Sequence, residues 1–204
     1  MSTLAIVTFT DGTRPTQLAQ CTASIEVDLP SGATHHVIPV QGLAYYAQQR
    51  VEAMALADYV CFVDDDDIIV NKSLSTTFAA IQSGNYAYAF TDEALTDTTG
   101  KVLHVRSGRR TYEQLTKMPW MFHHLSMYKT SIFSGKDLSY LNGRIGGVNF
   151  RFSQIAANEG NAIHVPFVGY NWTQSPTSLS RRTPIMSIQP YKVTKTGLIP
   201  EYKI

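Results

Sequence analysis

Four consecutive aspartates, Asp64 to Asp67, are the residues of this chain whose type and spacing most clearly suggest chemistry. They follow the apolar run 59–63 and precede the apolar pair 68–69. Carboxylates this close repel one another and raise each other's pKa, so a cation or full hydration must offset them. Oxygen ligands select hard divalent ions, and a diphosphate can complete the coordination shell. The cluster predicts an Mg²⁺ or Mn²⁺ site, with a solvated acidic turn before a helix near Asn71 as the alternative.

The segments before the aspartates alternate between strand and helix patterns. Runs of β-branched and apolar residues predict strands, and apolar residues at intervals of three or four predict helices. In chain order we expect a strand at 4–9, a helix at 16–25, a strand at 34–40, a helix at 43–57 and a strand at 59–63. This order is typical of a parallel sheet with right-handed crossovers, which binds ligands at the carboxyl ends of its strands. The aspartates fall at such an end.

The α/β pattern continues through the second half of the chain. We expect helices at 74–81, 112–118 and 150–158, and strands at 86–90, 101–105, 124–128 and 162–165. Beyond Trp172 the periodicity fades, which predicts a tail that wraps the domain or orders on ligand binding.

Length and composition fit one globular domain, because 204 residues with 44% hydrophobic content can bury a continuous core. The net charge of +1 conceals an asymmetry. Residues 1–100 carry 12 acidic and 3 basic side chains, whereas residues 101–204 carry 4 and 14. The acidic half suits a cation, and the basic half suits a diphosphate, an acidic polymer or a nucleic acid. The sequence has neither a signal-peptide pattern nor an apolar run of about 20 residues, which predicts a cytoplasmic protein without a transmembrane anchor.

The order of elements and the aspartate motif resemble the family 2 glycosyltransferases of the GT-A fold. The resemblance rests on 59–67, on Arg50 in the preceding helix, and more weakly on 90–101, 123–128 and 170–181. It implies a Rossmann-like, mixed but mainly parallel sheet flanked by helices, in a single domain spanning 1–204. Residues 1–105 would form the half that binds nucleotide sugar and metal, and 106–204 the acceptor-binding half with the C-terminal tail.

The resemblance also implies roles for individual residues. Asp64 would lie near the ribose or sugar of the donor and contact the metal, and Asp66 would be the principal metal ligand. The donor, most simply a UDP-sugar, would be bound by residues of the first half together with one late arginine: Thr8, Phe9, Thr10, Arg14, Gln41, Arg50, Asp64, Asp65 and Arg181.

The chain departs from the family pattern at three places. The acidic pair expected at the start of the last core helix, which supplies the general base, falls on Val148 and Asn149, and an amide cannot take a proton. Gln41 stands where an aspartate often contacts the uracil ring, and the late histidine that often completes the metal shell is missing at 174–175. Besides the Asn149 position, candidates for the base are Asp92, Glu93, His123 and His124.

The resulting hypothesis is a metal-dependent transferase that moves a sugar from a nucleotide-diphosphate sugar to a hydroxyl of a glycan or another acceptor. Basic residues of the second half, such as Arg181 and Arg182, would neutralise the leaving group. A noncatalytic domain that binds a nucleotide sugar or glycan is one alternative, suggested by Asn149. A viral-type enzyme that glycosylates DNA is another, suggested by the basic second half. A two-metal nuclease would need further acidic residues that the second half lacks at suitable positions.

Overall fold

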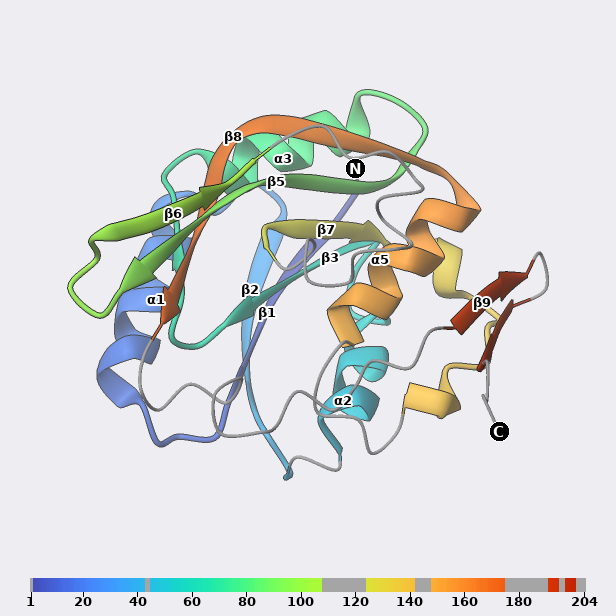
Figure 1. Ribbon diagram of the computed structural model, residues 1–204, viewed down its shortest axis with the longest axis horizontal. Coiled ribbons are helices and arrows are strands. Elements are labelled where there is room, and N and C mark those ends of the chain that lie inside the picture. Colours follow the sequence, from blue (N-terminus) through green and yellow to red (C-terminus); the bar gives the residue numbers. More distant parts are fainter. Residues whose placement is uncertain are drawn as a thin grey trace.

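The computed structural model describes residues 2–42, 45–107, 124–141 and 148–174, together with the backbone of 191–194 and 197–200. In this part of the chain one mixed sheet forms the centre of the molecule, with helices on both faces (Figure 1). Its strands are β1 (Leu4–Thr10), β2 (Ala33–Pro39), β3 (Tyr59–Asp64), β4 (Ile68–Ile69), β5 (Tyr86–Asp97), β6 (Val102–Arg106), β7 (Ser126–Lys129) and β8 (Asn161–Gln174). The α-helices are α1 (Pro15–Val27), α2 (Tyr46–Ala53), α3 (Ser73–Gln82) and α5 (Val148–Glu159), and two short 3-10 helices are η3 (Thr130–Phe133) and η4 (Ser139–Leu141).

The strands of the sheet follow the order β2-β1-β3-β7-β5-β8-β4, and β6 pairs with β5. β1 is parallel to β2 and β3, and β5 is parallel to β8, whereas β7 is antiparallel to both β3 and β5. It follows that β1, β2, β3, β5 and β8 run in one direction and that β7 runs against them in the middle of the sheet. The expected mixed, mainly parallel sheet in a single domain is confirmed.

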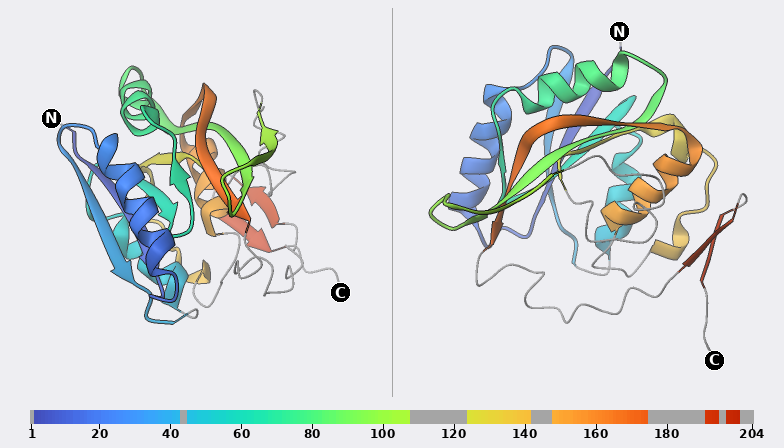
Figure 2. Two further views of the ribbon diagram at one scale, coloured as in Figure 1. Left: turned by 90° about the vertical axis from the view of Figure 1, so that its left-hand side faces the viewer. Right: turned by 45° about the horizontal axis from the view of Figure 1, so that its top comes forward.

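Two apolar layers lie between the sheet and the helices on its two faces. Figure 2 shows these helices on opposite sides of the sheet. Ala5, Val7 and Phe9 of β1 belong to the layer that also contains residues of α2 and α5. Leu4 and Ile6 belong to the opposite layer, with residues of α1 and α3. This alternation follows from the two-residue period of a strand, and β1 is buried along its whole length because both faces of the sheet are covered.

The predicted elements that lie in the described ranges are confirmed, with shifted ends, but β5 and β8 are much longer than predicted. They contain 12 and 14 residues instead of the spans 86–90 and 162–165. Their parallel pairing continues from Tyr86↔Asn161 to Asp97↔Gln174. The pairing supplies hydrogen-bond partners to polar residues whose own propensity for strands is low. The helix predicted at 112–118 lies outside the described residues.

A strand pair that the sequence did not predict follows in the C-terminal segment. β9 (Tyr191–Thr194) and β10 (Gly197–Pro200) form a separate antiparallel two-stranded sheet, drawn in red at the right of Figure 1. Among the described helices, none has the length and apolarity needed to cross a membrane.

Candidate metal centre and its surroundings

The aspartate cluster lies where β3 ends and the chain turns into β4. Asp64 is the last residue of β3, and the backbone N–H of Asp67 donates a hydrogen bond to the Asp64 carbonyl over 3.1 Å. Side chains two positions apart share a face only while a strand continues. Because the strand stops at Asp64 and a turn follows, the first and the fourth aspartates face the same space.

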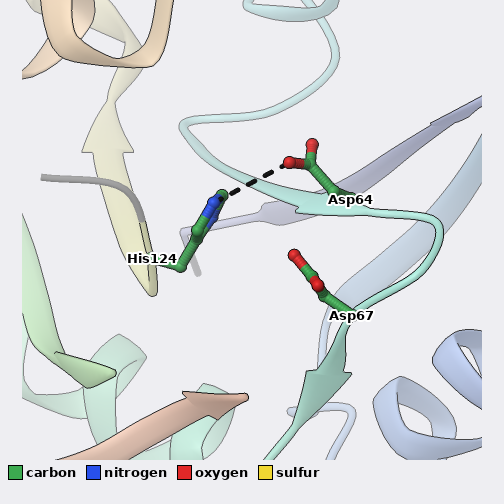
Figure 3. Close-up of side chains that lie close together, drawn as sticks. All are labelled: Asp64, Asp67 and His124. Atoms are coloured by element: carbon green, nitrogen blue, oxygen red, sulfur yellow. Dashed lines mark ion pairs between the residues drawn. The ribbon is translucent and has the colours of Figure 1, made fainter. Parts of the chain in front are cut away.

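Asp64, Asp67 and His124 point toward one another at this end of the sheet (Figure 3). One ligand atom from each residue lies within 4.8 Å of the others, and His124 Nε2 is 3.7 Å from Asp64 Oδ2. His124 comes two residues before β7, the antiparallel neighbour of β3, so strand pairing brings it to the aspartates. Two carboxylates and an imidazole fit a divalent transition ion such as Mn²⁺ better than Mg²⁺, which prefers oxygen ligands alone.

Asp67 is held in a fixed orientation by the end of β8. The Tyr170 hydroxyl donates to Asp67 Oδ2 over 2.8 Å, and the Thr173 N–H donates to Oδ1 over 2.7 Å. Tyr170 also accepts a hydrogen bond from the Asp64 N–H and stacks on the His124 ring at 4.2 Å between centroids. Burial, followed by the charges of Asp64 and Asp66, raises the pKa of Asp67 well above its ordinary value, although both hydrogen bonds act against the rise. A cation beside this carboxyl group would therefore stabilise its ionised form.

The two middle aspartates face Arg14 instead. Arg14 Nη2 lies 2.6 Å from Asp65 Oδ1, and Arg14 Nη1 donates to Asp66 Oδ2. Burial and the neighbouring Asp64 charge raise the pKa of Asp66 to about 6, while Arg14 lowers it. The metal-binding role expected for Asp66 stays a prediction, and it requires this ion pair to open.

Arg50 is the buried cation behind the centre, with 1% of its surface exposed. It donates to Asp64 Oδ1 over 2.9 Å, to the Tyr46 hydroxyl and to Asn149 Oδ1. Its guanidinium also lies over the ring of Phe62, 4.7 Å from the centroid. Burial by itself would lower the pKa of Arg50, but Tyr46 and Asp64 outweigh it and raise the pKa. A permanent charge thus fixes Asp64, and it also ties Asn149 of α5 to the same site.

The residues expected to contact the nucleotide lie at the ends of β1 and β2. The Thr8 hydroxyl is buried and lies 3.0 Å from His35 Nε2, and Phe9 packs among the aromatic residues around Arg50. The Thr10 hydroxyl accepts a hydrogen bond from a backbone N–H in the following turn, and Gln41 is exposed beyond β2. Their contacts with a nucleotide stay predictions.

Asp92, a candidate base, contacts a histidine that the sequence did not single out. Asp92 Oδ1 lies 2.8 Å from His164 Nε2, and both side chains are mostly buried, at 13% and 12% exposure. The next candidate, Glu93, pairs with Arg106 over 2.7 Å. Three residues named from the sequence lie outside the described part of the chain: His123, Arg181 and Arg182.

Sequence reasoning missed Asp67 as a candidate ligand, Tyr170 as its hydrogen-bond partner, and His164. For Asp67 a signal existed, because four polar residues between two apolar pairs predict a turn that joins the first and the fourth. For Tyr170 and His164 no local signal exists, since long-range pairing of β8 brings them to the site.

Comparison with solved structures shows that the chain has a GT-A-like fold. No family model and no curated protein sequence matches the chain. Among solved structures, S. aureus TarS residues 1–349 aligns with TM-score 0.60 and 14% identity over 84% of this chain and 60% of that one. Its complex with UDP gives TM-score 0.61 and 15% identity over 85% and 61%, and its complex with UDP-GlcNAc 0.64 and 12% over 90% and 62%. This chain thus spans about three fifths of those structures, and at these identities the similarity concerns the fold.

Proposed function

We propose that this chain is a metal-dependent glycosyltransferase domain that moves a sugar from a nucleotide-diphosphate sugar, with UDP as the nucleotide, to an acceptor hydroxyl. The observation that carries the proposal is the convergence of Asp64, Asp67 and His124 at the strand ends of a GT-A-like sheet. Support for the donor comes from TarS, a structure of similar fold that has been determined with UDP and with UDP-GlcNAc.

Asp64, Asp67 and His124 would hold the metal, with Mn²⁺ favoured over Mg²⁺ because Mg²⁺ prefers oxygen ligands alone. The bound ion would supply positive charge to the diphosphate of the donor. Whether Asp66 joins them depends on Arg14, which is only 21% exposed and pairs with Asp65 and Asp66. If a donor diphosphate attracts Arg14, the same movement frees Asp66 for the metal.

The protein residues around this centre position the donor and do not react with it. Arg50 is completely enclosed by Asp64, Tyr46, Asn149 and aromatic rings, so it cannot reach a substrate without leaving these partners. Its role would be to keep Asp64 ionised and oriented. Preorganised charge of this kind contributes to rate because no reorganisation is needed during the reaction.

A noncatalytic domain that binds a nucleotide sugar is the second candidate, and the contact between Arg50 and Asn149 favours it. Asn149 stands where the related enzymes carry an acid, and its amide oxygen already accepts a hydrogen bond from Arg50. The amide has no basic lone pair to take the acceptor proton. The second candidate holds if no other base serves the site.

Release of UDP from UDP-GlcNAc tests the proposed function. We expect release in Mn²⁺, little in EDTA, and loss of at least about 100-fold in Asp64→Asn, because that variant loses one ligand charge and the partner of Arg50. Glu26→Gln, which changes an exposed carboxylate on α1, is the matched control and should act like wild type. UDP binding without release would support the noncatalytic domain, and neither binding nor release would refute both candidates.

A further inference from the structure

We propose that Asp92 and His164 form the general-base dyad of this domain, in which His164 takes the proton of the acceptor hydroxyl and Asp92 orients it. The inference rests on the proposed function, since it names the base of that reaction. It answers the problem raised by Asn149, which cannot act as a base.

The dyad has the geometry that a histidine base requires. Asp92 Oδ1 and His164 Nε2 are 2.8 Å apart. An ionised carboxylate can only accept hydrogen bonds, so a neutral His164 must carry its proton on Nε2. The other ring nitrogen, Nδ1, then keeps its lone pair and is the atom that can take a proton. With 12% of the His164 side chain exposed, the ring still reaches the surface.

An aromatic column places His164 on the same face of the sheet as Asn149. Tyr128 stacks on Tyr88, Tyr88 on Phe90, and Phe90 on His164, with centroid distances of 5.2, 5.2 and 5.1 Å. At the other end of the column, the Tyr128 hydroxyl donates to the Asn149 carbonyl over 3.2 Å. The column crosses β7, β5 and β8 on the side covered by α5, which is the side where the missing acid would stand.

Hydrogen bonds also link the chain segments that carry the dyad and the candidate metal centre. Thr91 and Leu125 hydrogen-bond each other twice across β5 and the segment before β7, at 3.2 and 3.3 Å. Asp92 follows Thr91, and His124 precedes Leu125, so the orienting residue of the dyad and one residue of the metal centre are the chain neighbours of this bonded pair. The β5–β8 register shifts on both sides of Asp92, in the middle of β5, and such an irregularity re-aims a side chain relative to a regular strand.

In the reaction, the acceptor oxygen would form a bond to the anomeric carbon of the donor while its proton moves to His164 Nδ1. The bond between that carbon and the phosphate oxygen breaks, and its electron pair leaves with the nucleoside diphosphate. His164 becomes a cation beside the Asp92 carboxylate, which stabilises it. Water in place of the acceptor gives donor hydrolysis by the same proton transfer.

The test measures two quantities in the same variants: calorimetric affinity for UDP in Mn²⁺, and the rate of UDP release from UDP-GlcNAc in water. We expect His164→Gln to keep UDP affinity within about twofold and to lose about 10² to 10⁴ in rate, the usual contribution of a general base. Asp92→Asn should lose rate with unchanged UDP affinity. His104→Gln, a change of an exposed histidine on β6, is the matched control and should keep both.

Chemical rescue separates a base from a structural residue. In His164→Ala, added imidazole should restore part of the lost rate, which a purely structural role would not allow. If the wild type releases UDP and His164→Gln releases it at the same rate, the dyad is refuted and the proposed function stays intact. Loss of rate without rescue, accompanied by loss of UDP affinity, would also refute it. Absence of release from the wild type would overturn both proposals.

Discussion

Replacing Asp67 with asparagine should make the metal-free protein more stable and remove its stabilisation by Mn²⁺. Asparagine has nearly the same shape, and its amide oxygen can accept from the Thr173 N–H. Its NH2 group can donate to the Tyr170 oxygen once the Tyr170 hydroxyl proton, which now points at Asp67, turns away. The substitution therefore removes a buried charge with little change in packing. A residue kept for structure would give the opposite result, because loss of a well-bonded carboxylate would lower the stability.

The size of the effect follows from the spacing of the charges. Two unit charges 4.8 Å apart, the limit within the group Asp64, Asp67 and His124, repel by about 3.5 kcal/mol at an effective dielectric constant of about 20. Asp64 is 35% exposed, so solvent screens part of this repulsion, and about 1 to 3 kcal/mol is expected. In a chain of this length that corresponds to a rise in Tm of about 2 to 12 °C.

Thermal unfolding in EDTA and in Mn²⁺ measures both halves of the prediction. Wild-type protein should gain about 2.7 kcal/mol when Mn²⁺ is present at about 100 times its Kd, and Asp67→Asn should gain almost nothing. Asp66→Asn is the matched comparison, because it removes the neighbouring charge that pairs with Arg14. A lower Tm of Asp67→Asn in EDTA would refute the charge argument. A normal Mn²⁺ response in Asp67→Asn but not in Asp66→Asn would make Asp66 the ligand.

Three further predictions concern the support of the centre. Tyr170→Phe should lower the free energy of unfolding by about 1 to 3 kcal/mol in urea titrations, because buried Asp67 loses a donor; an unchanged midpoint would show that water replaces the hydroxyl. Gly169→Ala should lower the free energy of unfolding by about 1 to 3 kcal/mol and reduce UDP release, because the alanine Cβ would lie 2.5 Å from the Thr91 hydroxyl oxygen. A Gly169→Ala variant as stable as the wild type would contradict this close contact. In EDTA, the difference in Tm between Asp67→Asn and wild type should be near zero at about pH 4 and should grow as the pH rises. The reason is that the raised pKa makes Asp67 bind its proton more tightly in the folded than in the unfolded protein, so the wild type loses stability as Asp67 ionises. A Tm difference that is the same at every pH would contradict the raised pKa.

The sequence predicts the first half of the fold well, because local patterns decide it. β1 and β3 are apolar runs buried on both faces, and Leu18, Cys21 and Ile25 repeat at helical intervals in α1. The full lengths of β5 and β8 could not be predicted. Residues 91–97 are largely polar, and Pro166 and Gly169 interrupt the strand pattern after Val165, so both extensions depend on pairing with each other.

The candidate site, too, could be predicted only in part. The motif identified the cluster and Asp64, and helix periodicity placed Arg50 on the helix before it. The choice between Asp66 and Asp67 depends on where β3 stops, which hydrophobic pattern locates only to within a residue or two. The pairing of Asp92 with His164 depends on a register shift between two long strands, and no local pattern encodes such a shift.

The proposed function requires that Asp64 belong to a metal-dependent site for a nucleoside diphosphate. Calorimetric titration of UDP into the wild type and into Asp64→Ala, each with Mn²⁺ and with EDTA, tests it most directly. We predict UDP binding by the wild type that requires Mn²⁺ and disappears in the variant. The proposed function would be contradicted if UDP bound equally well with and without Mn²⁺ and with and without Asp64. It would also be contradicted if the wild type bound no UDP under either condition.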